Sequence, residues 1–138
     1  MTRLLLALPL FALAACVANQ RAYTPVQNVR YQAAGAEPFW LLAIGDDRIV
    51  LRMAGASDDV VYPRTLPRTH EGVTTWQSGN PPFVVTVEAR AGPCTNRSGQ
   101  TFEDRVRIRY SGDDLRAGRP FTEELTGCGG RLIRGGAG

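Results

Sequence analysis

Phe83-Val-Val-Thr-Val-Glu-Ala-Arg90 carries the clearest strand pattern in this chain of 138 residues. Apolar and polar side chains alternate along it, and a period of two residues is typical of a β-strand with one buried face. Four side chains are expected to share that face: Phe83, Val85, Val87 and Ala89. The sequence therefore predicts a half-buried strand over residues 83–90.

A second strand of the same kind is predicted over Arg105-Val-Arg-Ile-Arg-Tyr110. Its apolar side chains are expected to face the core, so Arg105, Arg107 and Arg109 project together from the other face, about 7 Å apart. Guanidinium groups bind carboxylates and phosphates through paired hydrogen bonds, which makes this stripe a candidate binding face. The alternative is a solvated face whose charges are balanced by nearby carboxylates: Glu88, Glu103 and Glu124.

Shorter strands are predicted on the N-terminal side of these two. Phe39–Ile44 and Arg48–Met53 flank the turn residues Gly45-Asp46-Asp47, which indicates a β-hairpin. Residues 60–62 and 73–76 have the composition of two further strands. Six strands are therefore expected between residues 39 and 110.

Turn and loop residues separate the predicted strands. Ser78–Pro82 has the composition of a loop and Gly112–Asp114 that of a turn. The region Asp113–Leu125 leaves room for one short helix. Short strands at intervals of about 8–12 residues, with Gly, Asp and Pro between them, predict an all-β fold, either a small antiparallel β-barrel or a sandwich.

The chain divides into four segments. Residues 35–134 are predicted to form the β domain, and residues 135–138 a disordered tail. Residues 16–34 are polar and lack a sustained period, so they are expected to form a flexible tether. Residues 1–15 have the features of a targeting segment.

That first segment reads Met1-Thr-Arg-Leu-Leu-Leu-Ala-Leu-Pro-Leu-Phe-Ala-Leu-Ala-Ala15 and is followed by Cys16. A positive charge at Arg3, an apolar run too short to span a bilayer and small residues at the end indicate a secretory signal peptide. The ending Leu13-Ala-Ala-Cys16 resembles the lipobox of bacterial lipoproteins, which implies lipid attachment at Cys16 and a place in the cell envelope. The alternative is an ordinary secreted protein whose Cys16 lies there by chance.

Lipidation of Cys16 would leave one pair of cysteines, Cys94 and Cys128, in an oxidising compartment. An even number of cysteines in an exported protein favours a disulfide. A bridge that closes a loop of roughly 35 residues contributes on the order of 4 kcal/mol in the chain-entropy model. The alternative is a metal site that includes the lone His70, but the clustered spacing of zinc ligands is missing.

The charge balance argues against nucleic acid as a partner. Every basic residue other than His70 is an arginine, and the chain has no lysine. Removal of residues 1–15 leaves 15 arginines against 13 carboxylates, a net charge of +2. Nucleic-acid-binding domains are more strongly basic, and export separates the protein from nucleic acid.

The sequence contains no recognisable catalytic or metal-binding constellation. A hydrolytic triad would need His70 beside an activated nucleophile, and the chain has no nucleophile-elbow motif. Three Asp-Asp pairs lie beside glycine or serine, where aspartate stabilises turns, and they lack the alternating ligands of a calcium loop. We therefore predict a protein that is not an enzyme and that has no metal and no cofactor.

Several segments resemble an uncharacterised family of small envelope proteins and lipoproteins of Gram-negative bacteria. They are Gly35-Ala-Glu-Pro-Phe-Trp40, Pro82-Phe-Val-Val-Thr-Val87, and Cys94 together with Gly127-Cys128-Gly129. The resemblance covers roughly residues 35–130 and implies a small β-barrel stapled by that cysteine pair. In layout such proteins are similar to the lipid-anchored inhibitors of C-type lysozyme, and more distantly to β-barrel lipoproteins that sense envelope stress.

These observations predict a lipoprotein held at the outer membrane by its lipid anchor, with a non-catalytic binding module as its β domain. Its partner, where there is one, is expected to meet the outer face of Arg105–Arg109 or the neighbouring loop Thr95–Thr101. Acidic protein loops and anionic envelope polymers fit such a cationic face. The alternatives are an inhibitor of a cell-wall-degrading enzyme and a purely structural envelope component.

Overall fold

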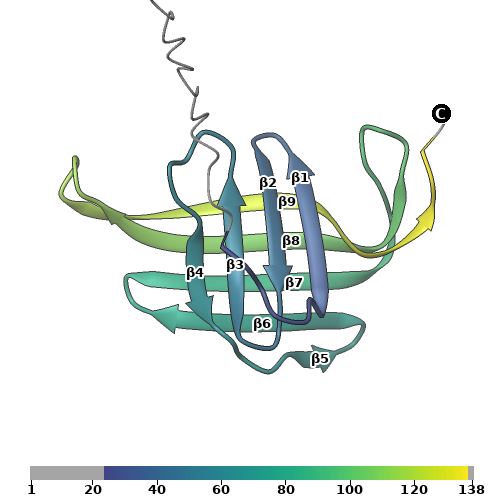
Figure 1. Ribbon diagram of the computed structural model, residues 1–138, viewed down its shortest axis with the longest axis horizontal. Coiled ribbons are helices and arrows are strands. Elements are labelled where there is room, and N and C mark those ends of the chain that lie inside the picture. The colour runs from purple at the N-terminus through teal and green to yellow at the C-terminus, as the bar shows by residue number, and fades with distance from the viewer. Residues whose placement is uncertain (1–23, 137–138) are drawn as a thin grey trace, which may run out of the picture.

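Nine antiparallel β-strands build the part of the chain that the structure, a computed structural model, describes: residues 24–136 (Figure 1). This range contains no helix, so the all-β prediction is confirmed, and the region Asp113–Leu125, which left room for one short helix, forms none. The predicted signal peptide, Cys16 and the last two residues of the tail lie outside the described residues. The strands are β1 (Tyr31–Ala36), β2 (Phe39–Ile44), β3 (Arg48–Met53), β4 (Val60–Pro63), β5 (Arg68–His70), β6 (Val73–Asn80), β7 (Phe83–Thr95), β8 (Thr101–Asp114) and β9 (Arg119–Arg134).

The strands form one sheet in the order β4-β3-β2-β1-β9-β8-β7-β6-β5. This sheet curls into a half-barrel in which β1–β4 cross over β6–β9 as a second layer (Figure 1). The two layers are joined by the short pairing of β1 with β9, where Ala34 lies opposite Cys128. They also meet where the Ser78 hydroxyl of β6 donates a hydrogen bond to the Pro63 carbonyl oxygen of β4.

The core lies between the two layers, and the predicted strand faces point into it. Five of the side chains expected to face inwards are buried: Val85, Val87, Ala89, Val106 and Ile108. Phe83 is the exception on β7, because it lies at the first position of the strand and is 55% exposed. Alternation along the sequence therefore predicted the buried faces of β7 and β8 correctly within each strand.

Trp40 of β2 packs where the two layers are joined. It is fully buried, and its Nε1 donates a hydrogen bond to the Thr126 carbonyl oxygen of β9 over 3.2 Å. A Cβ atom at Gly35 would lie 2.1 Å from this Nε1, and one at Gly127 would lie 2.7 Å from Cζ2 of the same ring. Contacts this short are not possible, so both positions require glycine. Each glycine lies in one of the segments quoted above for the family resemblance, where the backbone packs on this indole.

Strands β6 and β8 run further than the turn residues in the sequence suggested. The prediction of a loop over Ser78–Pro82 is wrong for its first three residues, because β6 continues to Asn80. The predicted turn Gly112–Asp114 is also strand, and Gly112 pairs with Phe121 of β9. Continued pairing with the neighbouring strand holds these residues extended, and tertiary context of this kind overrides local preference.

The folded domain begins before the predicted boundary at residue 35. Strand β1 occupies part of the segment that was assigned to the tether, residues 16–34, and that assignment is wrong for it. Tyr31 packs its ring against Trp76 with centroids 4.8 Å apart, and its hydroxyl donates to Asp104 Oδ2 over 2.9 Å. Even the Thr24 amide donates a hydrogen bond to the Asp59 carboxylate. The strand pairs along its whole length with β2 and over two residues with β9, although its own sequence has no clear alternation.

Candidate functional site

The predicted disulfide between Cys94 and Cys128 is present and lies on the outer face of the sheet. It joins the end of β7 to β9 across the intervening strand β8, with the two Cα atoms 5.5 Å apart. The pairing of β7 with β8 is irregular between Ala91 and Cys94, and such a bulge bends a strand locally. The Cys94 Sγ also lies 3.5 Å from the Gly127 carbonyl oxygen.

The three arginines of the predicted binding face are exposed on the outer face of β8. Arg105 lies opposite Cys128 of β9, Arg107 opposite Thr126 and Arg109 opposite Glu124. The stripe therefore runs beside the disulfide at one end and beside a carboxylate at the other. This difference gives the three guanidinium groups unlike surroundings.

Two of the three arginines have carboxylate partners. Arg107 pairs with Glu88 over 2.7 Å, and the hydrogen bond and charge of that carboxylate raise the pKa of the guanidinium above its usual value. Arg109 lies 3.4 Å from Glu124. The third carboxylate that could have balanced the stripe, Glu103, instead contacts Arg131 over 3.2 Å. Charge balance within the domain is therefore incomplete at Arg105.

A second arginine, and not a carboxylate, lies across from Arg105 on the neighbouring strand. Arg90 of β7 lies directly opposite it in the register of the two strands. Within residues 24–136 neither side chain forms an ion pair, and the nearest polar contact of Arg105 is the Pro93 carbonyl oxygen at 3.5 Å. Like charges opposite each other on neighbouring strands are destabilising. Arg90 was missed from the sequence because its place beside Arg105 depends on strand register.

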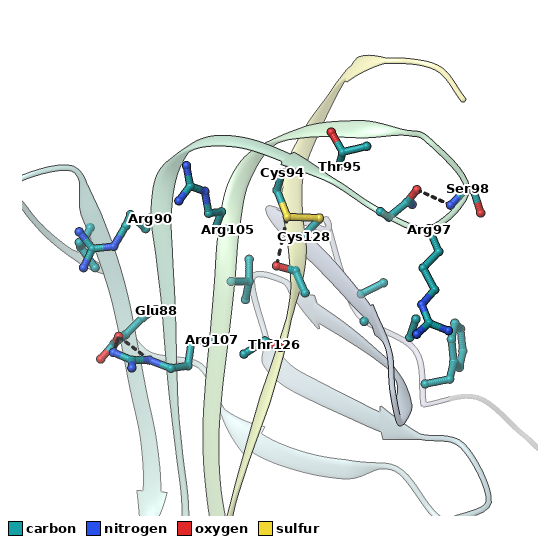
Figure 2. A pocket seen from close by; sticks show the side chains of 18 residues that line it. Glu88, Arg90, Cys94, Thr95, Arg97, Ser98, Arg105, Arg107, Thr126 and Cys128 are labelled. Carbon is teal, nitrogen blue, oxygen red and sulfur yellow. Dashed lines mark hydrogen bonds and ion pairs between the residues drawn. A yellow bond between two sulfur atoms is a disulfide. The ribbon is translucent and has the colours of Figure 1, made fainter. Parts of the chain in front are cut away.

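These arginines form one wall of a groove of about 850 Å³ that is open to solvent (Figure 2). Figure 2 shows Arg90, Arg105 and Arg107 on one side of the disulfide, and Arg97 and Ser98 on the other side. Apolar or small residues form much of the remaining lining: Ala34, Gly35, Ala36, Phe39, Val73, Cys94 and Cys128. The groove thus combines a cationic wall with an apolar floor.

The opposite wall is the hairpin loop between β7 and β8. Asn96 organises it, because its Oδ1 accepts hydrogen bonds from the Ser98 and Gln100 amides, each over 3.0 Å. Arg97 in this loop forms an ion pair with Glu37. The two surfaces predicted separately from the sequence, the arginine face and the loop Thr95–Thr101, therefore line one groove, although Arg109 lies outside it.

Other candidate chemistry is not gathered into a site. The His70 side chain is 87% exposed at the end of β5, with Glu71 as its neighbour at 3.7 Å. Across residues 24–136, no three of the His, Cys, Asp and Glu side chains come close enough together to hold a metal ion. The same range has no helix long and apolar enough to cross a membrane. The groove is therefore the strongest candidate for a functional site among the described residues.

Comparisons with protein-family models, with curated proteins and with solved structures found no match to this chain. Its function must be inferred from the side chains of the groove. Those side chains offer hydrogen-bond donors and positive charge, with no nucleophile beside a base among the lining residues.

Proposed function

We propose that this protein is a membrane-anchored envelope lipoprotein whose β domain is a non-catalytic binding module for an anionic partner. The observation that carries the proposal is the Arg90–Arg105 pair, which lines the groove and lacks a carboxylate within the described residues. An anion between these guanidinium groups would relieve their repulsion and accept several hydrogen bonds from each. The groove volume of about 850 Å³ lies within the usual range of ligand sites.

The kind of partner follows from the shape and charge of the site. A groove open at its surface admits an acidic protein loop or a segment of an anionic envelope polymer. Arg107 adds a third guanidinium group, because its ion pair with Glu88 is exposed and exposed pairs of this kind are weak. A phosphate or carboxylate can therefore compete for it.

Arg90→Ser combined with Arg105→Ser is expected to weaken the capture of partner material from envelope extract by roughly tenfold or more, because each charge-assisted hydrogen bond contributes about 1.5–3 kcal/mol. The control is Arg109→Ser, which removes one positive charge from the face of β8 that carries Arg105, but outside the groove. Its capture should stay within about twofold of the wild-type protein, since exposed charges outside a site contribute little. Bound material is quantified by mass spectrometry at two salt concentrations.

Identical captured material from all three proteins would overturn the anionic-partner proposal. In that case the purely structural role predicted from the sequence would gain support. Capture of a cell-wall-degrading enzyme that survives the loss of Arg90 and Arg105 would instead favour the inhibitor alternative, acting through another surface.

The membrane anchor is a separate part of the proposal and rests on Cys16, outside the described residues. Replacing Cys16 with alanine removes the proposed site of lipid attachment, so it is expected to abolish incorporation of labelled palmitate. Retention in the membrane fraction should also be lost, because stable anchoring requires two or more acyl chains. Val17 rather than aspartate follows the cysteine, which favours an outer-membrane location facing the periplasm. Cys94→Ala, which removes a cysteine of the β domain instead, should keep the label.

A Cys16→Ala protein that still fractionates with membranes would contradict the anchor. Wild-type protein that takes up no label and is released from the membrane fraction would instead support the alternative of an ordinary secreted protein.

A further inference from the structure

A second groove of about 530 Å³ adjoins the arginine groove. The two share five lining residues: Ala34, Phe39, Asn96, Ser98 and Cys128. Because the sheet supplies three of these and the β7–β8 loop supplies the other two, the grooves meet where that loop lies against the seam of β1 and β9. One ligand could therefore occupy both.

The second groove differs from the first in chemistry. Its walls include exposed or half-buried apolar side chains from the outer face of β2 and from β8, among them Phe39, Leu41 and Phe102. Among the lining residues that fall within 24–136, the one charged side chain is Arg52, which is already paired with Asp59 over 2.9 Å. This described part of the lining offers mainly apolar contact.

Phe39 marks the junction between the two grooves. The side chain is 51% exposed, although Trp40 beside it in the sequence is fully buried. A large aromatic residue left half in water, in a groove that also contains an uncompensated pair of arginines, indicates a ligand with an apolar part as well as an anionic part.

We propose that the ligand of this site is an anionic amphiphile, with a phosphate or carboxylate head at Arg90 and Arg105 and an acyl chain that lies across Phe39 into the second groove. This inference rests on the proposed anion-binding function and specifies its ligand class. A polar polymer would satisfy the arginines but leave the apolar groove uncovered. Each methylene group buried there raises affinity by roughly fourfold.

Three small probes separate the head from the chain: octyl phosphate, methyl phosphate and octyl glucoside, each used at a concentration at which it is monomeric. The protein is the whole chain from Cys16 onwards with Cys16→Ser, so that no attached lipid competes. Calorimetry should show octyl phosphate binding, with methyl phosphate and octyl glucoside each weaker by roughly tenfold or more.

The variants assign each part of the probe to its groove. Arg90→Ser with Arg105→Ser should weaken octyl phosphate by roughly tenfold, and Phe39→Ser should weaken it by roughly threefold while leaving methyl phosphate unchanged. Arg109→Ser is the control and should bind octyl phosphate like the wild-type protein. All of these side chains are exposed, so the variants are expected to fold, which a thermal melt checks.

Equal affinity for octyl phosphate and methyl phosphate would overturn the amphiphile and leave the anion-binding function in place. If octyl phosphate and octyl glucoside bind with equal affinity, and if Arg90→Ser with Arg105→Ser leaves that affinity unchanged, both the amphiphile and the anion-binding function are overturned. No binding of octyl phosphate would overturn the amphiphile alone, because capture from envelope extract tests the anionic partner independently.

Discussion

Replacing Trp40 with alanine is expected to lower the free energy of unfolding by about 3–5 kcal/mol, the usual cost of truncating a buried large aromatic side chain. The indole is fully buried between the two layers, and its loss also leaves the Thr126 carbonyl oxygen without its donor. Small domains have a total stability of about 5–15 kcal/mol, so a substantial fraction of the variant should be unfolded or aggregated. Urea denaturation followed by circular dichroism measures the change.

Phe39→Ala provides the matched control, because Phe39 is the adjacent aromatic residue of the same strand but is half exposed. Its removal should cost only about 1 kcal/mol of stability, since much of its surface is already in water. Trp40→Phe should fall between the two, because it keeps a ring and loses the Nε1 donor. Equal stability of the Trp40→Ala and Phe39→Ala proteins would contradict the importance of the buried indole.

The buried faces of the strands could be predicted from the sequence because alternation is a local property. Val85 and Val87 on β7 and Ile108 on β8 are fully buried, as the period of two residues requires. The hairpin of β2 and β3 could be predicted equally well, because two apolar runs flank the turn residues Gly45-Asp46-Asp47. These features depend only on neighbours in the chain.

The ends of the strands depended on distant partners and the first strand lacks a local pattern, so neither could be predicted. β8 continues through Gly112 because β9 pairs with it there, although glycine and aspartate locally favour a turn. β1 has no clear alternation, yet it lies between β2 and β9 and pairs with both. Strand propensity is too dependent on context to reveal such a segment.

Only part of the candidate site could be predicted, because the rest of it also depends on residues that are distant in the sequence. Arg105 and Arg107 share a face by their spacing, but Arg90 joins them only through the register between β7 and β8. The loop that forms the second wall reaches the groove through the irregular pairing after Ala91. Glu103, one of the carboxylates that could have neutralised the stripe under the alternative interpretation, contacts Arg131 instead, which no local pattern predicts.

Removing the disulfide through Cys94→Ala with Cys128→Ala is expected to lower the free energy of unfolding by about 4 kcal/mol in the chain-entropy model. The bridge spans 34 positions in the sequence, so its loss gives the unfolded chain much more freedom. Both cysteines also line the arginine groove, and the bridge ties the end of β7 to β9 beside it. Denaturation of the variant and of the wild-type protein, with and without reductant, measures the difference.

Reductant should destabilise the wild-type protein by a similar amount and leave the double variant unchanged, since the variant has no bridge to lose. Alkylation without reduction, followed by mass spectrometry, should leave Cys94 and Cys128 of the wild-type protein unmodified. Free thiols at both positions in exported protein would contradict the bridge. A bridge that is present but whose loss changes stability by less than about 1 kcal/mol would show that strand pairing alone constrains this loop, against the chain-entropy expectation.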